Sequence, residues 1–303
     1  MSAQSEWSVS GPRTLEFAEP VRTLTVRLVG GTVNVVGTTE DGPARLEVSA
    51  VDGPPVSVSH EDGTLSVGYD DLPWKGFLTF LDRRGWQRSA VVSVTVPAAT
   101  RVEVGVVGAG AVVSGISGPT ELRGVNGDGT LVGLSGPVRA DTVGGNVEAQ
   151  ALTGDLRFHS VSGDLTVVEG TGGAVRAESV SGDMVLDLDP ATGAEIELTT
   201  VSGEIAIRLP DPADAKVDAG TTTGAVTNAF DDLRVTGQWG AKRITGSLGA
   251  GTGRLRATTV SGALALLRRP AYEESDGPAG AAPPGAPGEG PSPTTPPAGK
   301  KVL

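Results

Sequence analysis

Val161-Ser162-Gly163-Asp164 is followed by two near copies, Val180-Ser181-Gly182-Asp183 and Val201-Ser202-Gly203-Glu204. Glycine also recurs about every nine residues, at Gly118, Gly127, Gly136, Gly145, Gly154, Gly163, Gly173 and Gly182. A fixed short period is the signature of a stacked repeat. Because about nine residues suffice for one short strand and one tight corner, two units predict a coil of about eighteen residues.

The segments between the corners alternate between two kinds of side chain. Ile205, Ile207 and Leu209 alternate with Ala206 and Arg208, which is typical of a strand with one buried face. Small and β-branched residues dominate, and they suit the thin interior of a narrow coil. The sequence therefore predicts an all-β fold, a single-stranded, β-helix-like β-solenoid with two short strands per coil.

The corners themselves carry a second set of expectations. Glycine confined to a corner predicts a tight turn or a positive φ, and Gly203, Gly224 and Gly262 are expected to end one column of stacked corners. The Ser and Asp beside each glycine are expected to bind nearby backbone amides, as they do in turns. Stacked carboxylates could instead bind calcium, but the Gly-Gly-x-Gly-x-Asp nonapeptide of calcium-binding rolls is absent. We therefore favour turn chemistry for Asp128, Asn146, Asp164, Asp183 and Glu204.

Three regions follow from the spacing. Residues 1–100 contain strands at less regular intervals and an aromatic insert at residues 69–88. Residues 101–268 are predicted to form the regular β-solenoid. Residues 269–303 are rich in Pro, Gly and Ala and have no apolar period, which predicts a disordered tail.

Composition excludes several classes of function. The chain has 303 residues, a formal net charge of −12 and a pI of about 4.7, which argues against nucleic-acid binding. There is no cysteine, so disulfides and thiolate chemistry are excluded. The N-terminus does not look like a secretory signal, and no apolar run approaches the length of a membrane-spanning helix. We therefore expect a cytoplasmic protein.

The corner motifs, together with the two ends of the repeat, resemble a known family. The residues that carry the resemblance are Val161–Asp164, Val180–Asp183, Val201–Glu204, Thr258–Gly262, Val29–Val33 and His60–Leu65. Over roughly residues 20–268 the chain resembles the bacterial adhesin-like β-strand-repeat proteins of unknown function, also called toastrack domains, and their actinobacterial branch. The resemblance implies a solenoid-like all-β fold and a loose link to envelope-associated signalling or adhesion. It implies no catalytic residues.

The aromatic insert is the first candidate for function. Trp74, Phe77, Phe80 and Trp86 lie among basic residues at spacings typical of an amphipathic helical turn. We favour a role in capping an open end of the solenoid, because an unpaired terminal coil invites aggregation. The alternative is that these residues dock a partner or make peripheral contact with a membrane.

An arginine column is the second candidate. Arg139, Arg157 and Arg176 are eighteen and nineteen residues apart and should stack on one outward face, where such a ladder could bind a polyanion. Asp141 and Glu178, two residues beyond the first and the last of these arginines, would largely neutralise it. We favour a solvated face of mixed charge.

The two histidines complete the set of candidates. Neither His60 nor His159 has the neighbouring ligands that a metal site requires, so both are interpreted as solvated, and neither a metal nor a cofactor is expected.

Two classes of function remain. The first is a non-enzymatic structural or interaction scaffold that presents a rigid β-solenoid to an unknown protein partner or to copies of itself, with a link to cell-envelope signalling. The alternative is a carbohydrate-binding or carbohydrate-active β-helix protein, which would need a groove with paired carboxylates and aromatic platforms. The regular coils offer Phe158 and little else for that purpose, so we expect no enzymatic activity.

Overall fold

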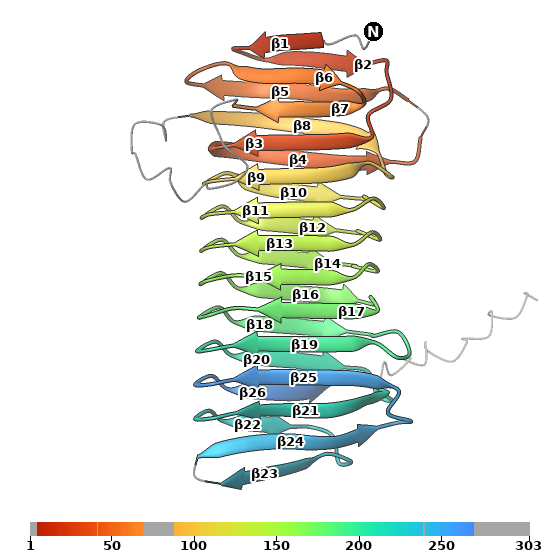
Figure 1. The fold of residues 1–303 in the computed structure, drawn as a ribbon, viewed down its shortest axis with the longest axis vertical. Coiled ribbons are helices and arrows are strands. Elements are labelled where there is room, and N and C mark those ends of the chain that lie inside the picture. The colour runs from red at the N-terminus through yellow and green to blue at the C-terminus, as the bar shows by residue number, and fades with distance from the viewer. Residues whose placement is uncertain (1–4, 41, 70–87, 239, 270–303) are drawn as a thin grey trace, which may run out of the picture. The chain divides into compact units, whose positions relative to one another are not determined.

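Two stacked β-sheets make up the fold. The computed structural model describes residues 5–40, 42–69, 88–238 and 240–269, whose strands form one sheet of 14 strands and one of 12. We call them sheet A and sheet B (Figure 1). The prediction of an all-β solenoid is confirmed.

In both sheets the spatial order of the strands departs from chain order at the two ends. Sheet A contains β1 (Ser5–Val9), β6 (Val56–Glu61), β7 (Thr64–Gly68), β3 (Thr23–Leu28), β9 (Arg101–Val106), β11 (Thr120–Gly124), β13 (Val138–Thr142), β15 (Leu156–His159), β17 (Ala174–Glu178), β19 (Glu195–Thr200), β25 (Gly253–Thr259), β21 (Ala215–Thr221), β24 (Ala241–Leu248) and β23 (Arg234–Gln238). Sheet B contains β2 (Arg13–Phe17), β5 (Ala44–Asp52), β8 (Ser89–Pro97), β4 (Gly30–Thr38), β10 (Gly110–Ser114), β12 (Gly129–Val132), β14 (Val147–Gln150), β16 (Leu165–Gly170), β18 (Met184–Leu188), β20 (Ile205–Leu209), β26 (Leu264–Arg268) and β22 (Val226–Asn228).

The central coils have the predicted repeat. From β9 to β20 each coil contributes one strand to sheet A and the next to sheet B, and all neighbouring strands are parallel. Thr120 pairs with Val138, and Val138 with Leu156. These pairs are eighteen residues apart, so the coil length expected from the glycine period is confirmed.

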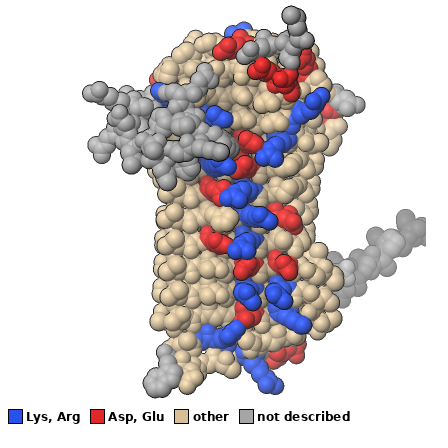
Figure 2. All heavy atoms as spheres, viewed as in Figure 1, with Lys and Arg blue, Asp and Glu red and all other residues tan. Residues whose placement is uncertain are grey.

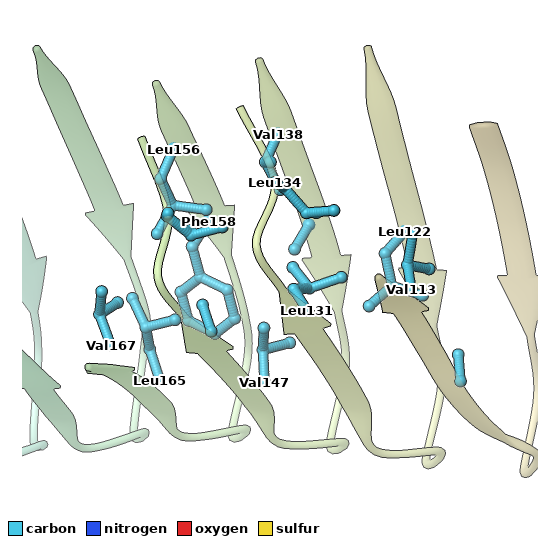
Figure 3. Packing of buried hydrophobic residues seen from close by; sticks show 14 of the residues in the cluster. Val113, Leu122, Leu131, Leu134, Val138, Val147, Leu156, Phe158, Leu165 and Val167 are labelled. Carbon is cyan, nitrogen blue, oxygen red and sulfur yellow. The ribbon is translucent and has the colours of Figure 1, made fainter. Parts of the chain in front are cut away.

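The core lies between the sheets. Alternate residues of each strand point inward, and Ile205, Ile207 and Leu209 are buried as the alternation predicts. The largest fully buried side chain is Phe158, and Figure 3 shows it between the sheets together with Leu156 and Leu165. Burying one aromatic side chain of this size stabilises a fold by roughly 3 kcal/mol.

The corner glycines are required by close contact between coils. A Cβ atom on Gly163 would lie 2.1 Å from the carbonyl oxygen of Gly145, and one on Gly182 would lie 2.0 Å from that of Gly163. Neither glycine has a positive φ, so of the two predicted reasons for glycine, a tight turn or a positive φ, the second does not apply at these positions. A second column of contacts holds Gly118, Gly136, Gly154 and Gly172, where the nine-residue spacing had indicated Gly173.

Hydroxyl groups complete each corner. The Gly163 N–H donates to Ser160 Oγ at 2.7 Å, and the Gly182 N–H donates to Ser179 Oγ at 2.9 Å. Thr200, Thr221 and Thr259 serve the later corners in the same way. These side chains are buried or half-buried, so they satisfy amides that water reaches poorly.

The last coils do not stack in chain order. Strands β25 and β26 lie between the coil of β19 and β20 and the coil of β21 and β22. The corner column therefore runs from Gly203 to Gly262 and then to Gly224, whereas the sequence led us to expect chain order. Strand β24 follows as the antiparallel neighbour of β21, and β23 pairs antiparallel with β24 at the end of sheet A (Figure 1).

Antiparallel strands also build the N-terminal end. Strands β1 and β6 extend sheet A, and β2 and β5 extend sheet B. Trp7 and Phe17 pack edge to face with ring centroids 5.5 Å apart, and Phe17 meets the His60 ring at 5.6 Å. His60 is only 5% exposed, so its interpretation as a solvated histidine is wrong: the residue points inward on β6 as part of an apolar cluster.

Two predicted segments lie outside the described residues. They are most of the aromatic insert, with Trp74, Phe77, Phe80 and Trp86, and the tail beyond Arg269. The capping and docking interpretations of the insert, and the interpretation of the tail as disordered, stay predictions.

We predict that Gly182→Ala destabilises the fold, because its Cβ would overlap the Gly163 carbonyl. Overpacking of this kind typically costs about 1–3 kcal/mol. Gly110→Ala is the matched control, since a Cβ there meets nothing within 4 Å. Urea unfolding followed by circular dichroism measures both, and an equal loss of stability in the two variants would contradict the proposed contact.

Candidate interaction surface

The outward face of sheet A carries most of the charged side chains of the regular coils. We call the outward side chains of β9, β11, β13, β15, β17, β19, β25 and β21 the charged face. Figure 2 shows Lys and Arg interspersed with Asp and Glu along it. Because the strands pair in register, these side chains form rows that run across the strands. One row consists of Glu103, Glu121, Arg139, Arg157, Arg176, Glu197, Arg256 and Asp218.

The three arginines predicted to stack lie next to one another in this row. Arg139 pairs with Arg157, and Arg157 pairs with Arg176, on adjacent parallel strands. The predicted arrangement is confirmed, and binding of a polyanion to it stays a prediction.

Carboxylates neutralise the outer two arginines. Arg139 donates to both oxygens of Asp141, at 2.7 and 3.0 Å. Arg176 donates to Glu178 at 2.9 Å and, across the strands, to Glu197 at 3.0 Å. These hydrogen bonds raise the pKa of the Arg139 and Arg176 guanidinium groups above its ordinary value. The pairs are exposed, so each contributes little to stability.

Arg157 differs from its neighbours. It makes no ion pair with any residue that the structure describes. His159, two residues further along β15, lies between two carboxylates, with Nδ1 3.2 Å from Asp141 and Nε2 3.9 Å from Glu178. Its side chain is 36% exposed, so it is half-buried in the face rather than fully solvated. The imidazole thus lies beside carboxylates of both neighbouring strands, but its Nδ1 has no hydrogen-bond partner.

The acidic corner column binds backbone amides of neighbouring coils. The Asp164 N–H donates to Asn146 at 3.0 Å, the Asp183 N–H donates to Asp164 at 2.8 Å, and the Glu204 N–H donates to Asp183 at 2.7 Å. The expected side-chain-to-amide bonds exist, but they join successive coils rather than residues of one turn. Among the described residues, no group of three or more His, Cys, Asp or Glu side chains is placed to hold a metal ion.

Sheet B presents a different surface. Val36, Val91, Val185 and Leu267 are exposed on its outward side. A ladder of valines, each about half exposed, also follows one corner of the coils: Val161, Val180, Val201 and Val260. The sequence did not indicate this exposure, because a valine beside a corner and a valine in the core look alike in a period-two pattern.

One ion-pair cluster fixes the inserted coil to sheet B. Asp187 on β18 accepts hydrogen bonds from Arg208 on β20 and from Arg269, whose Nη2 lies 2.7 Å from Oδ1. Only 14% of the Asp187 side chain is exposed. Burial by itself would raise the pKa of this carboxyl, but the hydrogen bonds from Arg208 and Arg269 outweigh burial and hold its pKa below the ordinary value.

A family model described as Toastrack DUF4097 matches residues 29–267. Three solved structures described as putative adhesins or cell-adhesion proteins are similar in fold. The Bacteroides fragilis structure has 12% identity and a TM-score of 0.47, with 88% of this chain and 97% of that chain covered. The Parabacteroides distasonis structure has 13% identity and a TM-score of 0.41, with 88% and 97% covered. The Clostridium sporogenes structure has 13% identity and a TM-score of 0.29, with 89% and 100% covered. A search of curated proteins gave no match.

We predict that Asp187→Asn lowers the free energy of unfolding at pH 7 by about 1–3 kcal/mol, because charge-assisted hydrogen bonds to both arginines are lost. A carboxyl whose folded pKa is depressed stabilises the fold above its unfolded pKa and loses that effect as the pH falls. The difference from the wild type should therefore shrink below about pH 4. Urea unfolding at pH 7, 5 and 3.5 measures it. Asp231→Asn, at a fully exposed carboxylate, is the control, and a difference that does not change with pH would contradict the assignment.

Proposed function

The chain belongs to the toastrack DUF4097 family, and we propose that it acts as a non-enzymatic scaffold that presents a rigid surface to a protein partner or to further copies of itself. The observation that carries the proposal is the register of the charged face. Parallel pairing keeps each outward side chain about 4.8 Å from its equivalent on the next strand. A partner with a complementary row of charges could form many ion pairs with this face at a fixed spacing.

Rigidity supports this role. Backbone hydrogen bonds join successive corners, as from the Ser181 N–H to the Val161 carbonyl. Side-chain carboxylates also bind amides of the next corner, as Asp164 does with the Asp183 N–H. Ion pairs such as that between Arg176 and Glu197 then connect neighbouring strands on the surface. A surface that is ordered before binding loses little conformational entropy when a partner docks.

The pairing of the carboxylates also favours binding over catalysis. Glycoside hydrolysis needs two carboxyl groups that face a bound substrate. On the charged face, Asp141 is instead paired with Arg139, and Glu178 with Arg176. Their ion pairs hold them in the face itself.

The cellular setting is part of the same proposal. We place the scaffold in the cytoplasm, with a role linked to cell-envelope signalling. Among the described residues, no helix meets the length and hydropathy needed to cross a bilayer.

Site-specific photo-crosslinking in a bacterial host tests the scaffold role. A photoreactive residue at Arg157, on the charged face, should give a discrete adduct, either with a partner or with a second copy of the chain. The same residue at Thr166, which points outward on sheet B, is the matched control. The double variant Arg139→Glu with Arg176→Glu should reduce the adduct at least tenfold, since it reverses the charge on both sides of Arg157.

Two results would contradict the proposal. One is crosslinking of equal strength from both faces, or from neither. The other is release of oligosaccharide from a polysaccharide panel by the purified protein, which would favour a carbohydrate-active enzyme instead.

A further inference from the structure

Sheet A has an open strand edge at each of its two ends. Strand β1 is the first strand of the sheet and β23 is the last (Figure 1). Among the described residues, β1 has one neighbour in the sheet, β6, and β23 has one neighbour, β24. The free side of each strand therefore presents backbone N–H and C=O groups to which another strand could bind.

Both end strands run in the direction of the regular coils. Strand β1 is antiparallel to β6, β6 is antiparallel to β7, and β7 is parallel to β3. In the same way β23 is antiparallel to β24, β24 is antiparallel to β21, and β21 is parallel to β25. A second copy stacked head to tail would therefore place its β1 parallel to β23, as the strands of the regular coils pair.

The register of sheet A assigns opposite charges to the two edges. The outward row of Arg157 can be followed through β3, β7 and β6 to Glu6 on β1. In the other direction it can be followed through β24 to Arg234 on β23. Both side chains are exposed, and neither forms an ion pair with a described residue. A copy that continues this register would place its Glu6 opposite Arg234, one strand spacing of about 4.8 Å away.

The adjacent inward row supplies apolar surface at the same place. Val235 pairs with the fully buried Ile244, and Trp7 pairs with the fully buried Val58. Because paired residues lie on the same side of a sheet, Val235 and Trp7 both face the core side. Val235 is nevertheless about half exposed, and Trp7 is only partly buried. The register that brings Arg234 to Glu6 also brings Val235 to Trp7, where each would cover apolar surface of the other.

We propose that copies of this chain associate head to tail, with β23 of one copy pairing in parallel with β1 of the next. Arg234 then lies opposite Glu6 of the second copy and Val235 opposite its Trp7, so sheet A continues from copy to copy. Opposite charges favour this contact over β23 with β23 or β1 with β1, which would bring charges of one sign together. Because two different strands form the contact, it does not close at a dimer and further copies can be added.

Head-to-tail association deepens the scaffold proposal and rests on it for its role. It names a second copy as the partner and places the contact at the ends of sheet A. The crosslinking test uses Arg157 on β15, in the middle of the sheet and far from both edges. Loss of the Arg157 adduct and loss of head-to-tail association are therefore separate results.

Sedimentation velocity of the full chain, from low to high micromolar concentration, tests the contact. The average mass of the wild type should rise with concentration and pass beyond that of a dimer. Arg234→Glu and Glu6→Arg should each raise the concentration needed for association about tenfold, because attraction across the contact becomes repulsion. An equimolar mixture of the two variants should return that concentration to within about threefold of the wild type, since each altered strand then meets the opposite charge.

Arg254→Glu is the matched control. Arg254 is an exposed arginine of sheet A that forms no ion pair with a described residue, and it lies on β25, which has a neighbouring strand on both sides. This variant makes the same change of charge as Arg234→Glu and should leave association within about twofold of the wild type. Circular dichroism checks that each variant keeps its β-signal. The proposal is overturned if the wild type stays monomeric or stops at a dimer, if Glu6→Arg has no effect, if mixing the variants restores nothing, or if Arg254→Glu weakens association as much as Arg234→Glu.

Discussion

Direct contact between the backbones of successive corners sets the geometry of this protein. Where Gly182 lies over Gly163, there is no room for a Cβ, so the coils approach closely enough for amides and side-chain oxygens of one corner to bind the next. The spacing of glycines drifts from eighteen residues to nineteen and then twenty-one. The strands absorb the extra residues outside the contact, as at the register shift between β16 and β18, where Glu169 has a φ of 58°. The corners therefore stay aligned although the coils differ in length.

Aligned corners keep the strands in register, and register determines the surface chemistry. A residue type that recurs once per coil becomes a row on one face. On sheet A the rows carry opposite charges two residues apart, as in Arg139 and Asp141, so most of the charge is neutralised within the face. On sheet B and along one corner several of these positions are apolar instead, with Val180 and Val185 both about half exposed. The outward surfaces of the two sheets therefore differ in charge.

The sequence predicted what depends on local repetition. Alternation identified the buried side chains of β20, and the nineteen-residue interval placed Arg157 beside Arg176. It did not predict the position of β25 and β26, because their residues fit the column equally well at either place and chain order is the simpler assumption. It also did not predict the burial of His60. That burial depends on contact with Phe17, which is distant in sequence and lies on β2 of the other sheet.

The departure from chain order at the C-terminal end changes how the side chains of sheet A pair. In the regular coils Arg101, Arg123, Arg139 and Arg176 each pair with a carboxylate two residues away on the same strand, with Arg157 as the exception. At the end of sheet A, β24 runs antiparallel to β21, so its residues meet partners that the repeat did not select. Gly220 then pairs with Arg243, while Lys242 pairs with the buried Thr221 and so lies on the opposite side of the sheet. The rows that the repeat builds across the regular coils therefore end at β21.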